Sequence, residues 1–169
     1  MFEPPLNADE RGLWLECAGD LDRIVGPENW NYSGSRIIES PAKMGTDLDI
    51  VVLIPPGREE KFDEEYFQWR DIDVPNPWES HGGSICDERG GFGRVPPRTI
   101  FLSLKQDFIN LIITQNPDFY QKFMIATSIA RFCNLREKKD RIDLFQHILY
   151  GAEAPHCMAE YLAVDAEYL

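Results

Sequence analysis

Residues 46–54 constrain the fold most strongly, because they join two carboxylates to an apolar run. The segment is rich in β-branched residues, and its unbroken apolar second half predicts a strand that is buried on both faces. Asp47 and Asp49 are two residues apart, so a strand would bring both carboxylates to one face. Two carboxylates at the open end of a buried strand are costly without a cation between them. The segment therefore predicts a site for Mg²⁺ (or Mn²⁺).

The rest of the pattern predicts a single α/β (α+β) domain over residues 1–169. We expect a small mixed sheet with helices packed on one face. Its strands are expected at residues 31–33, 46–54, 99–104 and 108–114, the last two as a hairpin.

Helices are expected on both sides of this strand region in the sequence. The first covers residues 9–24, with Asp9 as its cap and Leu13, Cys17, Leu21 and Ile24 on one apolar face. Residues 36–40 favour a short helix. Residues 57–98 form a long, acidic and glycine-rich connection. The C-terminal part, residues 116–169, is expected to be helical. It opens with a helix from Asn116-Pro117 to residue 135, whose apolar face includes Cys133, and continues with a second helix over 136–150.

Composition excludes several classes of protein. The net charge of −12 argues against a protein that coats nucleic acid through a general positive field. The cysteines at 17, 86, 133 and 157 are widely spaced, which argues against a zinc site or a disulfide framework. The chain shows no secretory leader and no apolar run of about 18 residues. We therefore expect a cytoplasmic protein that does not contact a membrane.

A Gly-Ser pair precedes the two aspartates. Gly34-Ser35 follows a short strand-like run, and glycine allows a backbone to approach a phosphate closely. Eleven residues then separate Ser35 from Asp47. This arrangement resembles the signature of the polymerase-β-like nucleotidyltransferase superfamily, and the segments 30–56 and 99–150 are similar to short nucleotidyltransferase-like proteins encoded by bacteriophages.

The resemblance implies a minimal nucleotidyltransferase fold and a set of site residues. Asp47 and Asp49 would bind the metal, and a third carboxylate is expected on a later strand. The matching position holds Asn110, and Asp107 is the nearest acid. An asparagine can coordinate a metal through its carbonyl, but it cannot act as a base. The nucleotide would be bound by Gly34, Ser35, Arg36 and Lys43, although a solvated lysine is the favoured interpretation of Lys43. Arg89, Arg94 and Arg98 could contact phosphates or balance acidic neighbours.

Two functions follow from these features. In the first, the protein transfers a nucleotide from an NTP to an RNA, protein or small-molecule hydroxyl, with catalysis at Asp47, Asp49 and Asn110. In the second, it is a catalytically inactive binding protein of phage origin on the same fold. It would inhibit a host protein in defence or transcription, in the host cytoplasm, by presenting an acidic surface that imitates nucleic acid. Asn110 and the negative charge favour the second function.

Overall fold

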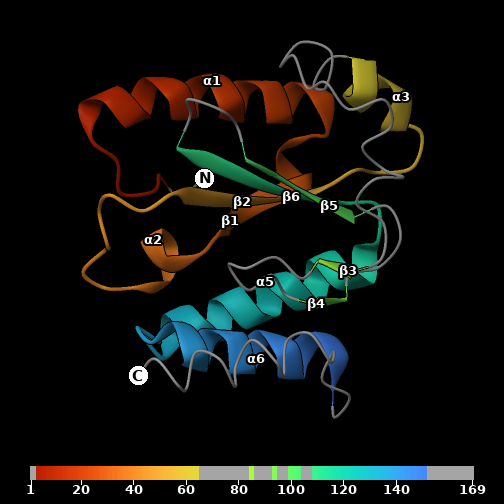
Figure 1. The fold of residues 1–169 in the computed structure, drawn as a ribbon. Coiled ribbons are helices and arrows are strands. Elements are labelled where there is room, and N and C mark those ends of the chain that lie inside the picture. Colours follow the sequence, from red (N-terminus) through yellow and green to blue (C-terminus); the bar gives the residue numbers. More distant parts are fainter. Residues whose placement is uncertain (1–2, 65–83, 86–92, 95–98, 104–107, 152–169) are drawn as a thin grey trace.

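The computed structural model describes residues 3–64, 84–85, 93–94, 99–103 and 108–151. Its centre is a four-stranded mixed sheet in the order β1-β2-β6-β5 (Figure 1). The central strands β2 and β6 are parallel, and each outer strand is antiparallel to its neighbour. The α+β class and the small mixed sheet are confirmed. The strands are β1 (Trp30–Ser33), β2 (Leu48–Leu53), β5 (Thr99–Ser103) and β6 (Ile109–Thr114), and a separate pair joins β3 (Ser84–Ile85) to β4 (Gly93–Arg94).

Helices cover both faces of the sheet. In Figure 1, α1 lies above the sheet, and α2, α5 and α6 lie below it. The described helices are α1 (Ala8–Ile24), α2 (Ser35–Ile38), α3 (Glu59–Phe62), α5 (Pro117–Phe132) and α6 (Lys138–Tyr150), with a 3₁₀ turn, η1 (Pro27–Asn29), between α1 and β1. The expected packing of helices on one face only was therefore wrong.

The alternation along β2 explains the two layers. Ile50 and Val52 pack into the core beneath α1, whereas Val51 packs with Ile112 against α5 and α6. All of these side chains are at most 5 % exposed. The expectation that this strand is buried on both faces is confirmed. By the same alternation, Asp49 points toward the layer of α2, α5 and α6.

Helix α1 begins earlier than the sequence pattern predicted. Asn7 caps it, in a reciprocal capping box with Glu10, so the assignment of Asp9 as the cap was wrong. The buried stripe was expected to contain Leu13, but Leu13 is 37 % exposed, and Trp14 takes its place. Gly26, at a φ of 92°, ends the helix region and lets the chain turn into the sheet.

The two C-terminal helices pack against each other and against the sheet. Asn116 caps α5, as expected from Asn116-Pro117. Phe123 of α5 contacts Phe145 of α6 with ring centroids 4.9 Å apart. Cys133 is exposed, which corrects its assignment to the apolar face of this helix. It is the C-cap residue, one position beyond the last residue of α5.

Several expectations concern residues outside the described ranges. These are Asp107, Arg89, Arg98, Cys86, Cys157, most of the 57–98 connection, and the tail after residue 151. Within the part of the connection that is described, α3 places Phe62 in the core beneath α1. Among the described helices, none has the length and apolarity to cross a bilayer.

Candidate functional site

The two aspartates and Asn110 converge at one end of the sheet. Asp49 and Asn110 are direct neighbours in the register of β2 and β6. Asp47 lies one residue before β2 and is exposed. The Asn110 Nδ2 donates to Asp47 Oδ2 and to Asp49 Oδ1, at 3.2 Å in each case. The three residues selected from the sequence as catalytic therefore meet around a single nitrogen atom.

Gly34 packs directly against this cluster. It follows β1, whose last residue, Ser33, is paired with Asp49. Gly34 adopts φ 78° and ψ −179°, a conformation that side chains other than glycine rarely adopt. A Cβ atom added at this position would lie 1.9 Å from Asp49 Oδ2. The glycine is therefore required twice, once for its backbone conformation and once for its contact with a carboxylate.

The site lies on the face of the sheet that is covered by α2, α5 and α6 (Figure 1). Ser33 is buried, and its Oγ is 2.8 Å from Oγ1 of Thr127 in α5. This contact joins the end of β1 to α5 beside the acidic cluster. Arg141, in the second turn of α6, exerts a favourable electrostatic effect on the Asp49 carboxylate. The site therefore combines two carboxylates, an amide and one nearby guanidinium.

Burial raises the pKa of Asp49 from 3.8 to about 6. The neighbouring charge of Asp47 also raises this pKa, while the hydrogen bond from Asn110 and the charge of Arg141 lower it. Near neutral pH the carboxylate is ionised in an environment that disfavours its charge. A bound cation would remove that penalty.

The donor set fits a hard divalent ion, but only with a movement of Asn110. Mg²⁺ takes oxygen ligands, often one or two carboxylates together with substrate phosphates. Asp47 and Asp49 meet that requirement, since one oxygen of each points toward a common nitrogen. Asn110 presents its NH₂ group to them and would have to turn its carbonyl inward to become a ligand. Within the described ranges, no group of three or more His, Cys, Asp and Glu side chains could hold a metal.

Arg36 and Lys43, both predicted to bind the nucleotide, differ in exposure. The Arg36 side chain is 1 % exposed and ion-paired with Glu10 at 2.8 Å. It therefore faces the interior, and we do not retain it as a nucleotide ligand. Lys43 is exposed in the loop before Asp47, so its side chain is free to meet a phosphate. Its carbonyl accepts a hydrogen bond from Thr46 Oγ1.

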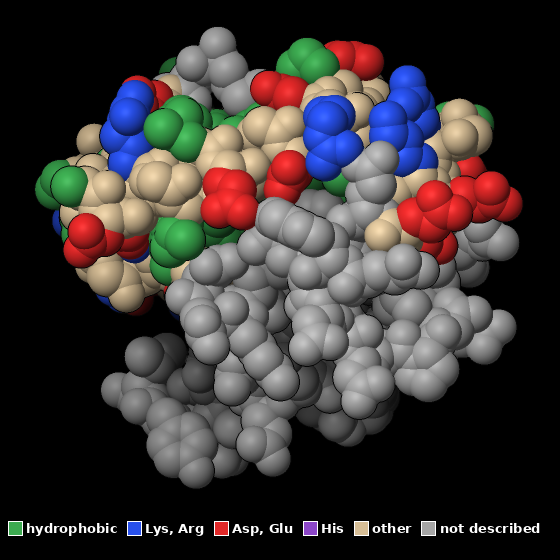
Figure 2. All heavy atoms as spheres, turned by 90° about the horizontal axis from the view of Figure 1, so that it is seen from above, with side chains coloured by type: hydrophobic (Ala, Val, Ile, Leu, Met, Phe, Trp, Pro, Cys, Tyr) green, Lys and Arg blue, Asp and Glu red, His purple; other side chains and the backbone are tan. Residues whose placement is uncertain are grey.

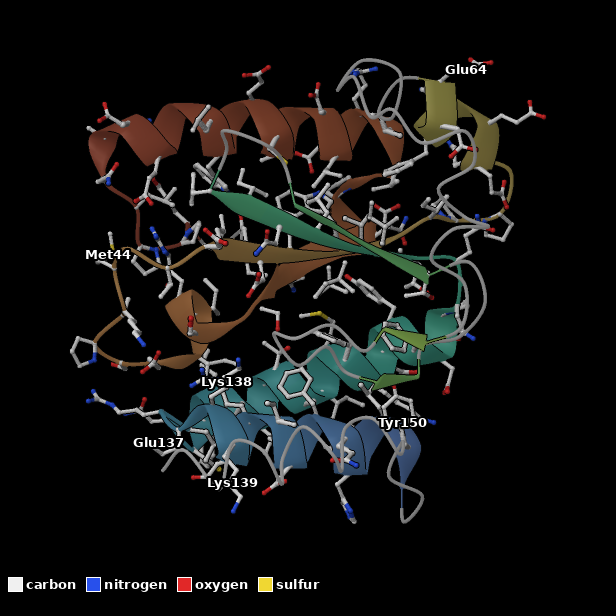
Figure 3. The ribbon with its side chains drawn as sticks, viewed as in Figure 1. Met44, Glu64, Glu137, Lys138, Lys139 and Tyr150 are labelled. Atoms are coloured by element: carbon white, nitrogen blue, oxygen red, sulfur yellow. The ribbon has the colours of Figure 1, made fainter. Side chains whose placement is uncertain are left out.

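Two lysines lie at one end of α6. Figure 3 shows Lys138 and Lys139 at the end of α6 that faces the loop carrying Met44, and Tyr150 at the other end. Both lysines are exposed. The sequence pattern did not single out Arg141, whose effect on Asp49 depends on the packing of α6 against α5.

Comparison with known proteins adds no relative: no family model, curated protein or solved structure matches this chain.

Proposed function

We propose that this protein is a metal-dependent nucleotidyltransferase with its site at Asp47, Asp49 and Gly34. One observation carries the proposal. The pairing of β1 with β2 brings the Gly-Ser turn, which is distant in the sequence, into contact with Asp49. Asp47 joins them through the shared hydrogen-bond donor Asn110. This is the juxtaposition that the resemblance to polymerase-β-like nucleotidyltransferases implies.

Each residue has a separate task in the proposed reaction. Asp47 and Asp49 would hold Mg²⁺ (or Mn²⁺), which supplies charge neutralisation for the triphosphate and for the transferred phosphoryl group. The backbone at Gly34-Ser35 would approach phosphate oxygens next to Asp49, since no side chain intervenes at Gly34. Arg141 and Lys43 would meet the remaining phosphate charge. Arg141 would do so with nitrogens other than Nη1, which donates to the carbonyls of Leu135 and Arg136.

The transfer step needs only the NTP and the acceptor hydroxyl as reactants. The acceptor hydroxyl oxygen forms a bond to the α-phosphorus of the NTP, and the bond to pyrophosphate breaks. The hydroxyl proton passes to water or to a carboxylate, because an amide such as Asn110 cannot accept it. Pyrophosphate leaves with the negative charge that the cations of the site stabilise.

A thermal-shift titration tests the proposal. Wild type, Asp47→Ala and Asp143→Ala are melted with each of the four NTPs, with and without Mg²⁺. Asp143 is an exposed acid on α6 and serves as the matched control. A ligand that binds only the folded state raises the melting temperature. We expect a Mg²⁺-dependent rise for wild type and the control that is absent in Asp47→Ala; no rise with any NTP would refute the proposal.

Asn110 favours a second function, that of a non-catalytic binding protein on this fold. The amide bridges the two carboxylates and occupies the position at which the resemblance implies a third carboxylate. The surface of α5 provides a further observation in favour of a binding protein. Helix α5 exposes Phe132 (93 %), Ile125 (46 %) and Ile129 (38 %) on one side, as protein-binding surfaces often do.

Charge imitation of nucleic acid is a separate part of this second function. Figure 2 views the molecule from the α1 side, where acidic and basic side chains both occur across the described surface. A binding protein of this kind should keep its function through Asp47→Ala. If a charged surface carries its association, that association should weaken steeply with salt. A pull-down from host lysate at two salt concentrations, with wild type and Asp47→Ala, separates the two functions.

A further inference from the structure

Asp47 is not held in place by the sheet. It precedes β2, so no ladder partner fixes its backbone. Its two neighbours in the chain are fixed instead. The N–H of Leu48 donates to the Phe108 carbonyl at 2.8 Å, and the carbonyl of Thr46 accepts a hydrogen bond from Arg36. The direction of the Asp47 side chain therefore depends on these two flanking contacts together with the hydrogen bond from Asn110.

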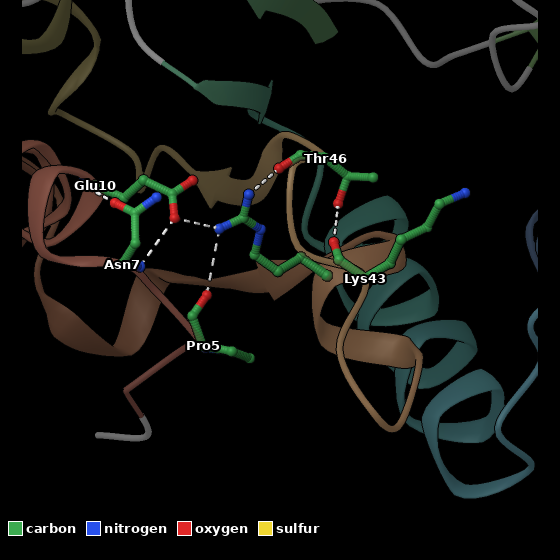
Figure 4. A network of polar contacts seen from close by, with 6 residues as sticks. Pro5, Asn7, Glu10, Lys43 and Thr46 are labelled. Atoms are coloured by element: carbon green, nitrogen blue, oxygen red, sulfur yellow. Dashed lines mark hydrogen bonds and ion pairs between the residues drawn. The ribbon is translucent and has the colours of Figure 1, made fainter.

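Arg36 touches both of these flanks. Its Nη2 donates to Thr46, and its guanidinium lies over the Phe108 ring, 5.3 Å from the ring centroid. Its Nη1 donates to Glu10 at 2.8 Å and to the carbonyl of Pro5 at 3.3 Å. Figure 4 shows how the network joins three segments: Pro5 before α1, the start of α1, and the loop before the aspartates.

A contribution to stability alone is a weak reason for this arrangement. Removing a guanidinium and a carboxylate from water costs about as much as the buried pair regains, so well-packed apolar residues often serve as well. A planar fork of donors, however, fixes several acceptors in one geometry. Arg36 is 1 % exposed and its acceptors come from three segments. What an arginine supplies here, and apolar residues would not, is therefore the fixed geometry of its donors.

From these contacts we infer that Arg36 is a positioning residue, which together with Glu10 aims Asp47 at Asn110 and Asp49. Its guanidinium acts on Asp47 through the Thr46 peptide and the Phe108 ring, and its burial keeps it away from a substrate. As a role in the proposed reaction, this inference rests on the proposed function. Its structural part, the orientation of Asp47, can be measured without any ligand.

The side-chain amide of Asn110 reports that orientation directly, since it donates to both aspartates. We would record its ¹H–¹⁵N signals in wild type, Arg36→Lys and Val25→Ala, and then titrate each protein with Mn²⁺. A lysine at position 36 keeps the charge but cannot bond Glu10 and Thr46 as a fork. Val25 is buried at the opposite end of α1 and provides a control for general loss of stability.

We expect the Asn110 signals of Arg36→Lys to shift or broaden and its Mn²⁺ affinity to fall at least about tenfold, or about 1.4 kcal/mol, with both unchanged in Val25→Ala. Wild-type amide signals and affinity in Arg36→Lys, together with lowered stability, would show a merely structural residue and overturn the inference. If wild type binds no Mn²⁺, the metal proposal fails, and the amide signals alone still decide the role of Arg36. If Arg36→Lys does not fold, Glu10→Gln gives the same readout, with wild-type signals again overturning the inference.

Discussion

Replacing Asp49 by asparagine removes one negative charge beside Gly34 and Asn110 and keeps the shape of the side chain. Burial raises the pKa of Asp49 in the folded protein from 3.8 to about 6. Below about pH 3.8 the carboxyl is protonated in both states, and its contribution to stability is fully present. As the pH rises toward 6, the unfolded chain ionises first, so folding becomes less favourable. Above pH 6 the loss stays constant.

The size of this loss follows from the difference between the two pKa values. About two pKa units correspond to about 3 kcal/mol. The Asp49 side chain keeps some exposure to water, which screens its charge, so we expect roughly 2 to 3 kcal/mol. Relative to wild type, Asp49→Asn should therefore gain this amount of unfolding free energy between pH 4 and pH 7.5.

Urea unfolding in EDTA, at steps of half a pH unit, measures the gain. Fluorescence of the buried Trp14 and Trp30 follows the transition. The matched control is Asp143→Asn, since Asp143 is exposed and its variant should run parallel to wild type at every pH. A difference between Asp49→Asn and wild type that stays flat, or falls as the pH rises, would refute the reasoning. A fall would mean that the hydrogen bond from Asn110 and the charge of Arg141 together outweigh burial, and that no cation is needed.

Three further predictions concern the packing and charge of the site and its neighbourhood. Gly34→Ala should destabilise the fold by roughly 3 to 5 kcal/mol, from backbone strain and overlap with the carboxylate; in a double-mutant cycle measured by urea unfolding, Asp49→Ala should recover part of that loss. Asn110→Asp should lower the melting temperature in EDTA, because it adds a third negative charge to the cluster. It should also raise Mn²⁺ affinity in a calorimetric titration. An unchanged melting temperature and affinity would contradict the assignment of a metal site here. Tyr32→Phe should cost about 1 to 3 kcal/mol in urea unfolding, because it leaves the buried Trp14 Nε1–H, which donates to Tyr32 Oη at 2.7 Å, without that acceptor.

Local patterns were enough to predict the elements of the sheet and the meeting of Asp47 with Asp49. A period of two and a buried apolar run fix which side chains share a face, and these signals lie within a few residues of one another. The close approach at Gly34 was also predicted, although for a phosphate. The structure shows that the group nearest to this glycine is the Asp49 carboxylate.

Contacts between distant segments were the ones that sequence reasoning missed. An arginine after a Gly-Ser turn resembles a phosphate ligand, and only the fold brings Glu10 to Arg36 across 26 residues. Helices on one face were expected even though the apolar run of β2 on both faces already requires cover on both. Arg141 acts on Asp49 because α6 packs against α5, which itself covers the sheet, and no local pattern reports this.

The central claim is that Asp47 and Asp49 form one divalent-ion site. Electron paramagnetic resonance of Mn²⁺, titrated at pH 7.5 into wild type, Asp47→Asn and Asp143→Asn, tests it most directly. We expect saturable binding in wild type and in Asp143→Asn, with a loss of at least about tenfold in affinity for Asp47→Asn. Equal binding in all three proteins, or no binding by wild type, would contradict the claim.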